Sequence, residues 1–580
     1  MTNTLKLALA FRARRKADDE RALTKLASAE HRAAAEERQV VDAAEHRMER
    51  VRQQDRHPIT LGTSLSSRGI SFPVLLTSEE VWGGHWSITG ATGAGKTFLA
   101  ISLLLQRFRH NFGRVVVIDM KGELAGLLRN VVIPSFIGTV GERHPEEALR
   151  LVSKVAVLAP FDTSAIPPFQ VLARDSALSI QEQAHEVASS FGRTIGRDLG
   201  VIQETVLRYA FQLAIDTQHN LLDVARLLVN DDLRRAALER TQLEDVRHYF
   251  ATRFPRERAS SVGALLSRLD SLTMYPSLRR MLSAPGMVRL PALLESAVTI
   301  IDLGGSPGGM RDVSQFLGQL FFQKLVRAIF ARRVRLDGQT PPVTIVADEF
   351  QELLTPDITR DFERFLTLAR SQRCFLWLLY QQAAQLEAKS PSLLRIVRTN
   401  VRHHALFNSA LEDARPFAHF LPVTGRRQQE QRGFPDPRQP ERFLTHDDER
   451  RELVELVPRM PDRVYWFCHP RADEAYPTVL VRSPHVDMPS MQAQASSLSP
   501  DLLSVITRGV VALQDQDQDG SEPEPGRGQE RDELTPAPER ITRPPDAAAP
   551  APEGDVDSDA DIDQTATKPK PTGKRRPSLG

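Results

Sequence analysis

The chain has 580 residues, 41% of them hydrophobic, so it is long enough for several domains with a sizeable core. Its formal net charge of +1 gives no argument for a nucleic-acid partner, and any DNA-binding surface must be local. Two cysteines without a CxxC motif favour a reducing compartment. With no run of about 18 uncharged apolar residues and no convincing signal peptide, we expect a cytoplasmic protein.

Five segments differ in composition along the chain. Residues 1–57 are rich in Ala, Arg, Glu and Lys and predict a charged helical arm, either solvated or docked to a partner. Residues 58–171 and 296–485 alternate strand-like and helix-like runs, which predicts an α/β fold with a parallel sheet covered on both faces. Residues 172–295 between them predict an all-helical insertion, and residues 486–580 a disordered tail.

Short apolar runs mark the expected strands of this sheet. They lie at 85–88, 114–119, 153–160, 298–302, 343–347, 374–380, 403–407, 463–468 and 477–482. The central runs are nearly continuous in Val, Ile and Leu, which is typical of parallel strands buried on both faces.

A glycine-rich loop follows the first of these strands and precedes the helical run FLAISLLLQRF. The loop reads GATGAGKT and comprises Gly90, Ala91, Thr92, Gly93, Ala94, Gly95, Lys96 and Thr97. Glycines let the backbone wrap around phosphates, so that N–H groups and the helix N-terminus face the anion. In such a loop Lys96 reaches the β- and γ-phosphates and Thr97 holds Mg²⁺. Strand, loop and helix together predict a site for ATP and Mg²⁺.

Two later strands end in polar residues that suit the same site. VTIVADE at 343–349 ends in Asp348, expected to hold Mg²⁺, and Glu349, expected to polarise the attacking water. Paired carboxylates at a strand end also occur as helix caps, but the phosphate loop upstream favours hydrolysis. The strand 374–380 is followed by Gln381, which we expect to sense the γ-phosphate, with Gln382 as the competing assignment.

The order of these motifs, together with RVVVIDMKGEL at 114–124, resembles the HerA/FtsK superfamily of DNA-pumping ATPases. More narrowly, ADEFQELL, FLTLARSQRCFLWLLYQQAAQL and TNVRHHALFNSALEDA resemble, in order and spacing, the TraG/TraD-type coupling proteins of conjugation and type IV secretion. The resemblance runs from about residue 84 to residue 422. It implies a RecA-like P-loop ATPase core and a homo-hexameric ring with DNA in its central channel.

The resemblance also implies hydrolysis between subunits, completed by an arginine finger from the neighbour. This finger falls on Arg370, before the glutamine strand, and Arg373 and Arg402 are rivals. The run IDMKGEL at 118–124 either couples the phosphate state to a moving loop or forms a local turn with charges facing water.

The chain departs from its relatives at three places. Familiar coupling proteins carry an N-terminal transmembrane anchor, where this chain has a charged helix. HerA carries a β-barrel before the phosphate loop, for which residues 58–83 leave little room. The Phe-Arg pair usual near the last core strand reads Phe407-Asn408. A role at a membrane pore therefore requires a partner that recruits the protein to the membrane periphery.

Three functions fit these observations. The leading hypothesis is an ATP-hydrolysing DNA translocase that pumps plasmid or mobile-element DNA, with transfer or secretion proteins and a relaxase as partners. The second is a HerA-like motor working with a nuclease in DNA processing or anti-phage defence. The third is a nucleotide-gated scaffold ATPase of a transfer machine. The sequence has no helix-turn-helix or zinc-finger signature, so we expect DNA binding without sequence specificity.

Overall fold

The computed structural model describes most of the chain between residues 42 and 509. The described ranges are 42–65, 71–162, 169–175, 178–195, 199–283, 293–294, 297–304, 311–332, 334, 340–354, 356–422, 427–428, 442–443, 445–468 and 478–509. Residues 42–54 of the predicted arm are helical. The predictions for residues 1–41 and 510–580 lie outside the described residues.

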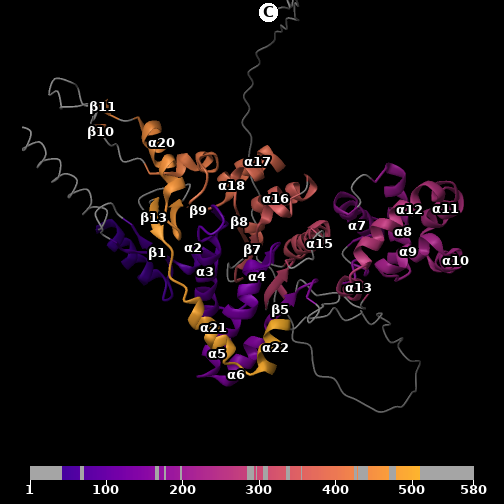
Figure 1. Ribbon diagram of the computed structural model, residues 1–580, viewed down its shortest axis with the longest axis horizontal. Helices are drawn as coiled ribbons and strands as arrows, with labels where there is room; N and C mark the ends of the chain where they lie inside the picture. Colours follow the sequence, from indigo (N-terminus) through magenta and orange to yellow (C-terminus); the bar gives the residue numbers. More distant parts are fainter. Residues whose placement is uncertain are drawn as a thin grey trace, which may run out of the picture. The chain divides into compact units, whose positions relative to one another are not determined.

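An 11-stranded sheet organises the structure (Figure 1). Its strands are β1 (Ile59–Ser64), β2 (Pro73–Leu76), β3 (Trp86–Thr89), β4 (Val115–Asp119), β5 (Val155–Leu158), β6 (Val298–Asp302), β7 (Val343–Asp348), β8 (Cys374–Tyr380), β9 (His403–Phe407), β12 (Val464–Cys468) and β13 (Val479–Arg482). They lie in the order β2-β1-β13-β12-β9-β3-β8-β7-β4-β6-β5.

The sheet is parallel only in part. Strands β3 to β9 pair in parallel, as expected. The other edge of the sheet adds antiparallel strands to the expected parallel sheet, because β12, β13, β1 and β2 pair antiparallel. The connection from β12 to β13 is shorter than the dozen or so residues that a parallel crossover needs, so these two strands form an antiparallel pair. The core is a RecA-like α/β fold extended by an antiparallel edge.

Each central strand sends its side chains to both faces of the sheet. In β4, Val115 and Val117 join one buried cluster, whereas Val116 and Ile118 join the other. This alternation follows from the two-residue period of a strand. Both faces are buried, which explains why these strands are apolar throughout.

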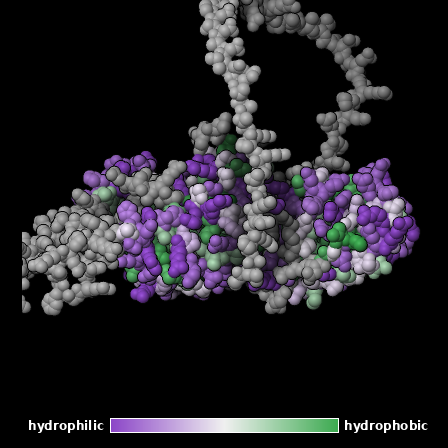
Figure 2. Space-filling view, turned by 90° about the horizontal axis from the view of Figure 1, so that it is seen from above, coloured by the Kyte–Doolittle hydropathy of each residue, from purple (hydrophilic) through white to green (hydrophobic). Residues whose placement is uncertain are grey.

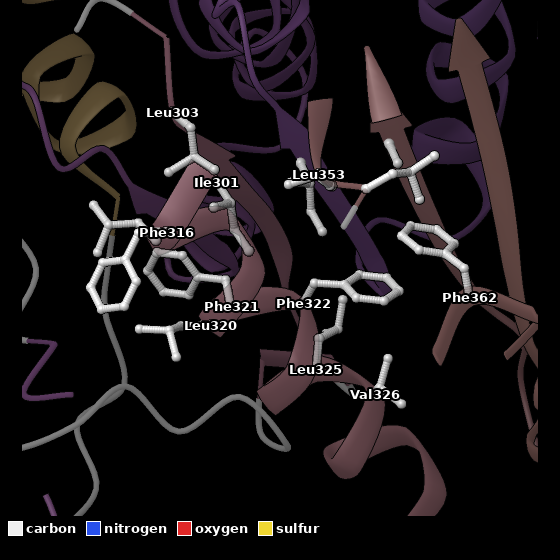
Figure 3. Packing of buried hydrophobic residues seen from close by; sticks show 14 of the residues in the cluster. Ile301, Leu303, Phe316, Leu320, Phe321, Phe322, Leu325, Val326, Leu353 and Phe362 are labelled. Atoms are coloured by element: carbon white, nitrogen blue, oxygen red, sulfur yellow. The ribbon is translucent and has the colours of Figure 1, made fainter. Parts of the chain in front are cut away.

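Helices cover both faces of the sheet. The cluster that contains Val115 and Val117 also includes residues of α3 (Lys96–His110), α4 (Glu123–Leu127), α5 (Ile133–Gly141) and α6 (Pro145–Val152). The cluster that contains Val116 and Ile118 includes residues of α15 (Arg311–Phe330), α16 (Pro356–Leu368), α17 (Ala383–Lys389) and α18 (Pro391–Asn400). Figure 3 shows Phe316 and Phe321 of α15 near Ile301 of β6, and Phe322 next to Phe362. The rings of Phe322 and Phe362 stack with centroids 4.1 Å apart.

Shorter elements complete the core. They are α2 (Ser78–Trp82), η1 (Leu128–Val132), η2 (Phe350–Glu352), η3 (Ala369–Gln372), α19 (Leu411–Ala414), η4 (Arg415–Phe420), β10 (Arg427–Gln428), β11 (Arg442–Phe443), α20 (His446–Leu456) and η5 (Val457–Arg459). Strands β10 and β11 pair only with each other.

Between residues 178 and 283 the described residues form helices only. These are α7 (Ile180–Thr194), α8 (Val201–Asp216), α9 (Leu221–Val229), α10 (Asp231–Arg240), α11 (Glu244–Thr252), α12 (Phe254–Thr273) and α13 (Pro276–Ser283). Side-chain caps start several of them: Ser179, Asn220 and Asn230 accept N–H bonds from the first turns of α7, α9 and α10. Phe191 of α7 meets Phe316 of α15 edge-on, with centroids 5.9 Å apart, so the insertion shares the core's buried cluster.

The boundary expected at 486 for a disordered tail lies too early. Residues after it form α21 (Met488–Ser496), capped by Asp487, and α22 (Pro500–Arg508), capped by Ser499. Helix α21 packs on α5 and η1, and α22 packs on α5 and β5. The buried Arg129 donates to the carbonyl of Thr507 and pairs with Asp162. The two short helices gain their stability from this packing, which a local reading of the sequence cannot detect.

One run among the described residues, Glu123–Gly141, is long and apolar enough to cross a membrane by length and composition. It spans α4, η1 and α5, and 56% of its most apolar window is buried inside the fold. Its contacts with α6 and α21 are those of a helix in a protein core.

Hydrophilic residues cover much of the face in view in Figure 2, with separate hydrophobic patches between them. Of the large apolar side chains that are exposed, Val201, Ile202, Val229 and Met274 belong to the helical insertion. Singly exposed apolar residues are normal on protein surfaces.

Removing the apolar anchor of α22 should destabilise the core. Ile506 is fully buried, so Ile506→Ala is expected to lower the free energy of unfolding by about 2–5 kcal/mol. The matched control Val505→Ala changes a side chain that is 46% exposed and should cost less than about 0.5 kcal/mol. Urea unfolding followed by tryptophan fluorescence measures both, because Trp82, Trp86, Trp377 and Trp466 all lie in or beside the sheet. Equal, small effects would mean that α22 does not stabilise the core.

Candidate nucleotide site

Polar residues gather where the parallel strands end. The phosphate loop follows β3, Gln381 follows β8, and Asp348 ends β7, and these three strands are neighbours in the order β3-β8-β7. Since parallel strands place their carboxyl ends at one edge, the two halves of the expected site converge there, with Gln381 between them.

The loop from Gly90 to Thr97 has the backbone that phosphate binding needs. Gly93 and Gly95 have φ values of 81° and 114°, a region that side chains rarely tolerate. Gly93 is exposed, and a Cβ on it would meet nothing within 4 Å, so open space lies beside the loop there. Lys96 Nζ lies 2.7 Å from the carbonyl oxygen of Gly90 and 3.0 Å from that of Ala91. Its ammonium group is thus held by two carbonyl oxygens at the start of the loop. The glycine-rich backbone and this lysine are the groups that a triphosphate needs.

Chain segments far away in sequence support the loop from below. The Asn408 carbonyl accepts the N–H of Ala91 at 2.6 Å, and the Asn408 amide donates to Met460 at 3.0 Å. The N–H of Arg463 donates to the Ala94 carbonyl at 2.8 Å, and its guanidinium lies 4.6 Å from the Phe98 ring centroid. Asn408, which replaces the usual Arg, therefore holds the loop. Sequence reasoning missed Arg463, because nothing in the neighbouring residues marks it. The structure shows its positive φ of 63°.

Three aspartates lie side by side at this edge. Asp119 of β4 is in register with Asp302 of β6 on one side and Asp348 of β7 on the other. Burial and the charge of Asp119 raise the pKa of Asp348 to about 7 and that of Asp302 to about 6. The edge thus concentrates negative charge that a bound cation would stabilise.

Asp119 organises the IDMKGEL run. Its carboxylate accepts N–H bonds from Lys121 and Gly122, both at 2.9 Å, and from Ala125 at 2.8 Å. Burial raises the pKa of Asp119, although these bonds oppose the shift. Asp119 therefore organises a local turn, but its carboxylate is fully buried and does not face water as the local-turn interpretation expected. Lys121 differs, because its side chain leaves the turn and reaches Glu349, with Nζ and Oε1 2.6 Å apart.

Glu349 has an unusual backbone and three side-chain donors. Its φ of 51° is left-handed, which is uncommon for a residue with a side chain. Lys121 and Gln381 donate to Oε1, and Gln351 donates to Oε2. Burial would raise the pKa of Glu349, but these hydrogen bonds outweigh it and lower the pKa. Gln381, rather than the exposed Gln382, is thus the amide that meets the acidic pair.

Thr97 and Asp348 present the oxygen ligands that Mg²⁺ prefers. Thr97 is half-buried on the first turn of α3. Asp348 ends β7 close to Lys96, and its negative charge acts to raise the pKa of Lys96. Burial of Lys96 lowers that pKa by more. Because Mg²⁺ takes only one or two protein ligands besides phosphate and water, this donor set fits the ion. Bound there, Mg²⁺ would neutralise phosphate charge.

Arg370 does not lie at this site in its own chain. It sits in η3, just before the amino end of β8, whereas Gln381 follows the carboxyl end. Seven residues of strand separate the two ends, a rise of roughly 20 Å. Arg370 is exposed and lies near His85, whose pKa is lowered to about 4 by burial and by the charge of Arg370.

The rival arginines are engaged at the same distant edge. Arg373 pairs with Glu79 at 3.0 Å, and its φ of 49° fixes the chain as it enters β8. The N–H of Arg402 donates to the carbonyl of His85 at 3.2 Å as the chain enters β9. None of the three expected candidates can therefore complete the nucleotide site of the chain that carries it.

Comparison with known proteins gives one family match. Residues 59–324 match the family model described as the central domain of the helicase HerA. No curated protein matches the chain.

Solved structures of similar fold come from secretion and conjugation systems. The bacterial conjugative coupling protein TrwBdeltaN70 is 14% identical over 73% of this chain and 89% of its own, with a TM-score of 0.48. VirB4 of Thermoanaerobacter pseudethanolicus is 15% identical over 75% of this chain and 99% of its own, with a TM-score of 0.46. The cytoplasmic domain of the type VII secretion ATPase EccC of Thermomonospora curvata is 15% identical over 78% and 31%, with a TM-score of 0.27.

The family match covers the phosphate loop, Asp119, Asp302 and the whole insertion at 172–295, and it ends before Asp348, Glu349 and Gln381. The chain is therefore a P-loop ATPase of RecA-like fold, and its residues 59–324 match the family model of the HerA helicase central domain.

Proposed function

We propose that the protein is a DNA translocase of the coupling type, which uses ATP hydrolysis to pump plasmid or mobile-element DNA to a transfer machine. The observation that carries this proposal is the separation of Arg370 from the phosphate loop. A motor that must borrow its finger from a neighbour works only as an assembly, which is how ring translocases couple hydrolysis to movement.

Each residue of the site has a role in this proposal. Lys96 and the loop amides from Gly90 to Thr97 hold the triphosphate, and Thr97 and Asp348 hold Mg²⁺. Glu349 accepts a proton from the attacking water, for which its hydrogen bonds must rearrange. Gln381 lies between loop and acid and senses the γ-phosphate. The hydrogen bond from Lys96 to the Gly90 carbonyl and the hydrogen bond from Gln381 to Glu349 support these roles.

A homo-hexameric ring would bring Arg370 of one subunit to the phosphates of the next. Arg370 is exposed at the amino edge of the sheet, the side away from its own phosphate loop, which suits a contact in trans. An arginine finger stabilises the charge that develops on the transferred phosphoryl group.

DNA would be held without sequence specificity, through its phosphates. The arginine-rich stretch at the start of α12 does not offer unpaired arginines for DNA phosphates at Arg253 and Arg258, because Arg253 pairs with Glu257 and Arg258 pairs with Asp231. Support for DNA as the track comes from the motif order and from the HerA family match. Transfer or secretion proteins, including a relaxase, would deliver the cargo.

A HerA-like motor that works with a nuclease is the second candidate, favoured by the family match itself. Both candidates predict the same ATPase site and the same dependence on DNA. A nuclease that co-purifies with the protein would favour this one, whereas a relaxase would favour transfer.

The loop lysine and the catalytic glutamate should separate binding from hydrolysis. We expect double-stranded DNA to stimulate ATPase turnover of the wild type, and Lys96→Ala to abolish turnover with and without DNA. Glu349→Gln should still bind ATP but lower turnover by at least about 100-fold, since a positioned general base contributes about 10²–10⁴-fold. Phosphate release and triplex displacement are the measurements. Brisk hydrolysis by Glu349→Gln would remove this residue from the mechanism, and hydrolysis without triplex displacement would favour a scaffold.

Arg370→Ala should lower turnover by about 10³-fold without weakening nucleotide binding. Because the finger acts in trans, mixing Arg370→Ala subunits with Glu349→Gln subunits should restore part of the activity. In such mixed rings an intact phosphate site can adjoin an intact finger. The matched control Arg364→Ala changes another exposed arginine, on α16, and should leave turnover unchanged. Absence of any recovery in mixed rings would contradict a finger supplied by the neighbour.

A further inference from the structure

Lys121 is a second lysine at the nucleotide site that the proposed mechanism does not yet use. Its Nζ lies 2.6 Å from Glu349 Oε1, and its side chain is 44% exposed while that of Glu349 is 9% exposed. Its backbone is fixed by the N–H bond to Asp119 and by Gly122, whose φ is 83°. The Lys121 ammonium group thus reaches Glu349 from a hydrogen-bonded turn, and the Lys121 side chain stays partly exposed to solvent.

The pairing leaves the Glu349 carboxylate with three hydrogen-bond donors, out of about four that a carboxylate can accept. Oε1 accepts from Lys121 and Gln381, and Oε2 accepts from Gln351. A carboxylate held by three donors, one of them a cation, is a weak base and has little capacity left to orient a water molecule. In this arrangement Glu349 is not available as a general base.

A triphosphate would offer Lys121 a stronger partner than Glu349. Lys121 lies close enough to Lys96 for its charge to lower the Lys96 pKa, although burial is the larger cause. The charges of Glu349 and Asp348 act on Lys96 in the opposite direction, so all four groups share one electrostatic neighbourhood. The γ-phosphate, which Lys96 contacts in phosphate loops, would bring further negative charge to this neighbourhood.

We propose that Lys121 is a positioning residue that exchanges partners: it pairs with Glu349 when the γ-phosphate is absent and with the γ-phosphate when ATP is bound. The exchange releases Glu349 to act as a base only when the substrate is in place. This inference rests on the proposed role of Glu349 and adds to it a means of distinguishing ATP from ADP.

Nucleotide affinity tests the exchange without relying on turnover. The full-length protein is titrated with Mg²⁺ and either ADP or the non-hydrolysable triphosphate AMP-PNP, using calorimetry. Lys121→Met should weaken AMP-PNP binding by about tenfold and ADP binding by less than about twofold, because only the triphosphate loses a charge-assisted contact. Lys121→Arg should keep most of the preference. Arg311→Gln, which breaks an exposed pair with Glu352 on the turn after Glu349, is the matched control and should change neither affinity.

A double-mutant cycle tests whether Glu349 competes for the lysine. If it does, Lys121→Met should cost more AMP-PNP affinity in the Glu349→Gln background than in the wild type, because the uncharged amide no longer competes. Equal costs in both backgrounds, or equal losses for ADP and AMP-PNP, would overturn the exchange. A wild type that hydrolyses ATP in a Lys96-dependent way while Lys121→Met keeps its preference would refute this inference alone. A wild type that binds no nucleotide would refute the proposed function.

Discussion

Parallel alignment of the central strands is the constraint on which the rest depends. Because β4, β6 and β7 run the same way and in register, Asp119, Asp302 and Asp348 end at the same edge, with Glu349 one residue further. Burial and the charge of Asp119 raise the pKa of Asp348 to about 7, so its charged form is costly there without a bound cation. Lys96 and Lys121 supply the positive charges at this edge. Carboxylates that can hold a cation and lysines that can hold phosphate therefore lie at the same edge of the sheet.

The antiparallel extension gives the phosphate loop its fixed support. β12 pairs with β9, and the chain entering β12 brings Arg463 beneath Ala94 while Asn408 leaves β9 to bond Ala91. A Cβ on Gly90 would lie 2.5 Å from Phe407 Cβ, so loop and strand are in direct contact. A glycine loop without such contacts would lose more entropy on binding phosphate.

The sequence was sufficient for features that depend on neighbours in the chain. The phosphate loop, the acidic strand and the glutamine strand are read from contiguous residues, and their convergence follows from parallel pairing alone. It was insufficient where distant segments decide. The antiparallel edge depends on a short connection after β12, the order of α21 and α22 depends on α5 and β5, and the Lys121–Glu349 pair joins residues 228 positions apart. Glu349's left-handed backbone likewise has no signature in VTIVADE.

Strand β8 connects the two ends of the proposed mechanism. Its seven residues are all buried, with Arg370 just before them and Gln381 just after. Neighbouring strands β3 and β7 pair with β8 along both of its sides, so β8 lies in the interior of the sheet. In the ring proposed above, the residue assigned to sense the γ-phosphate and the residue assigned as the finger would thus stand at opposite ends of one strand.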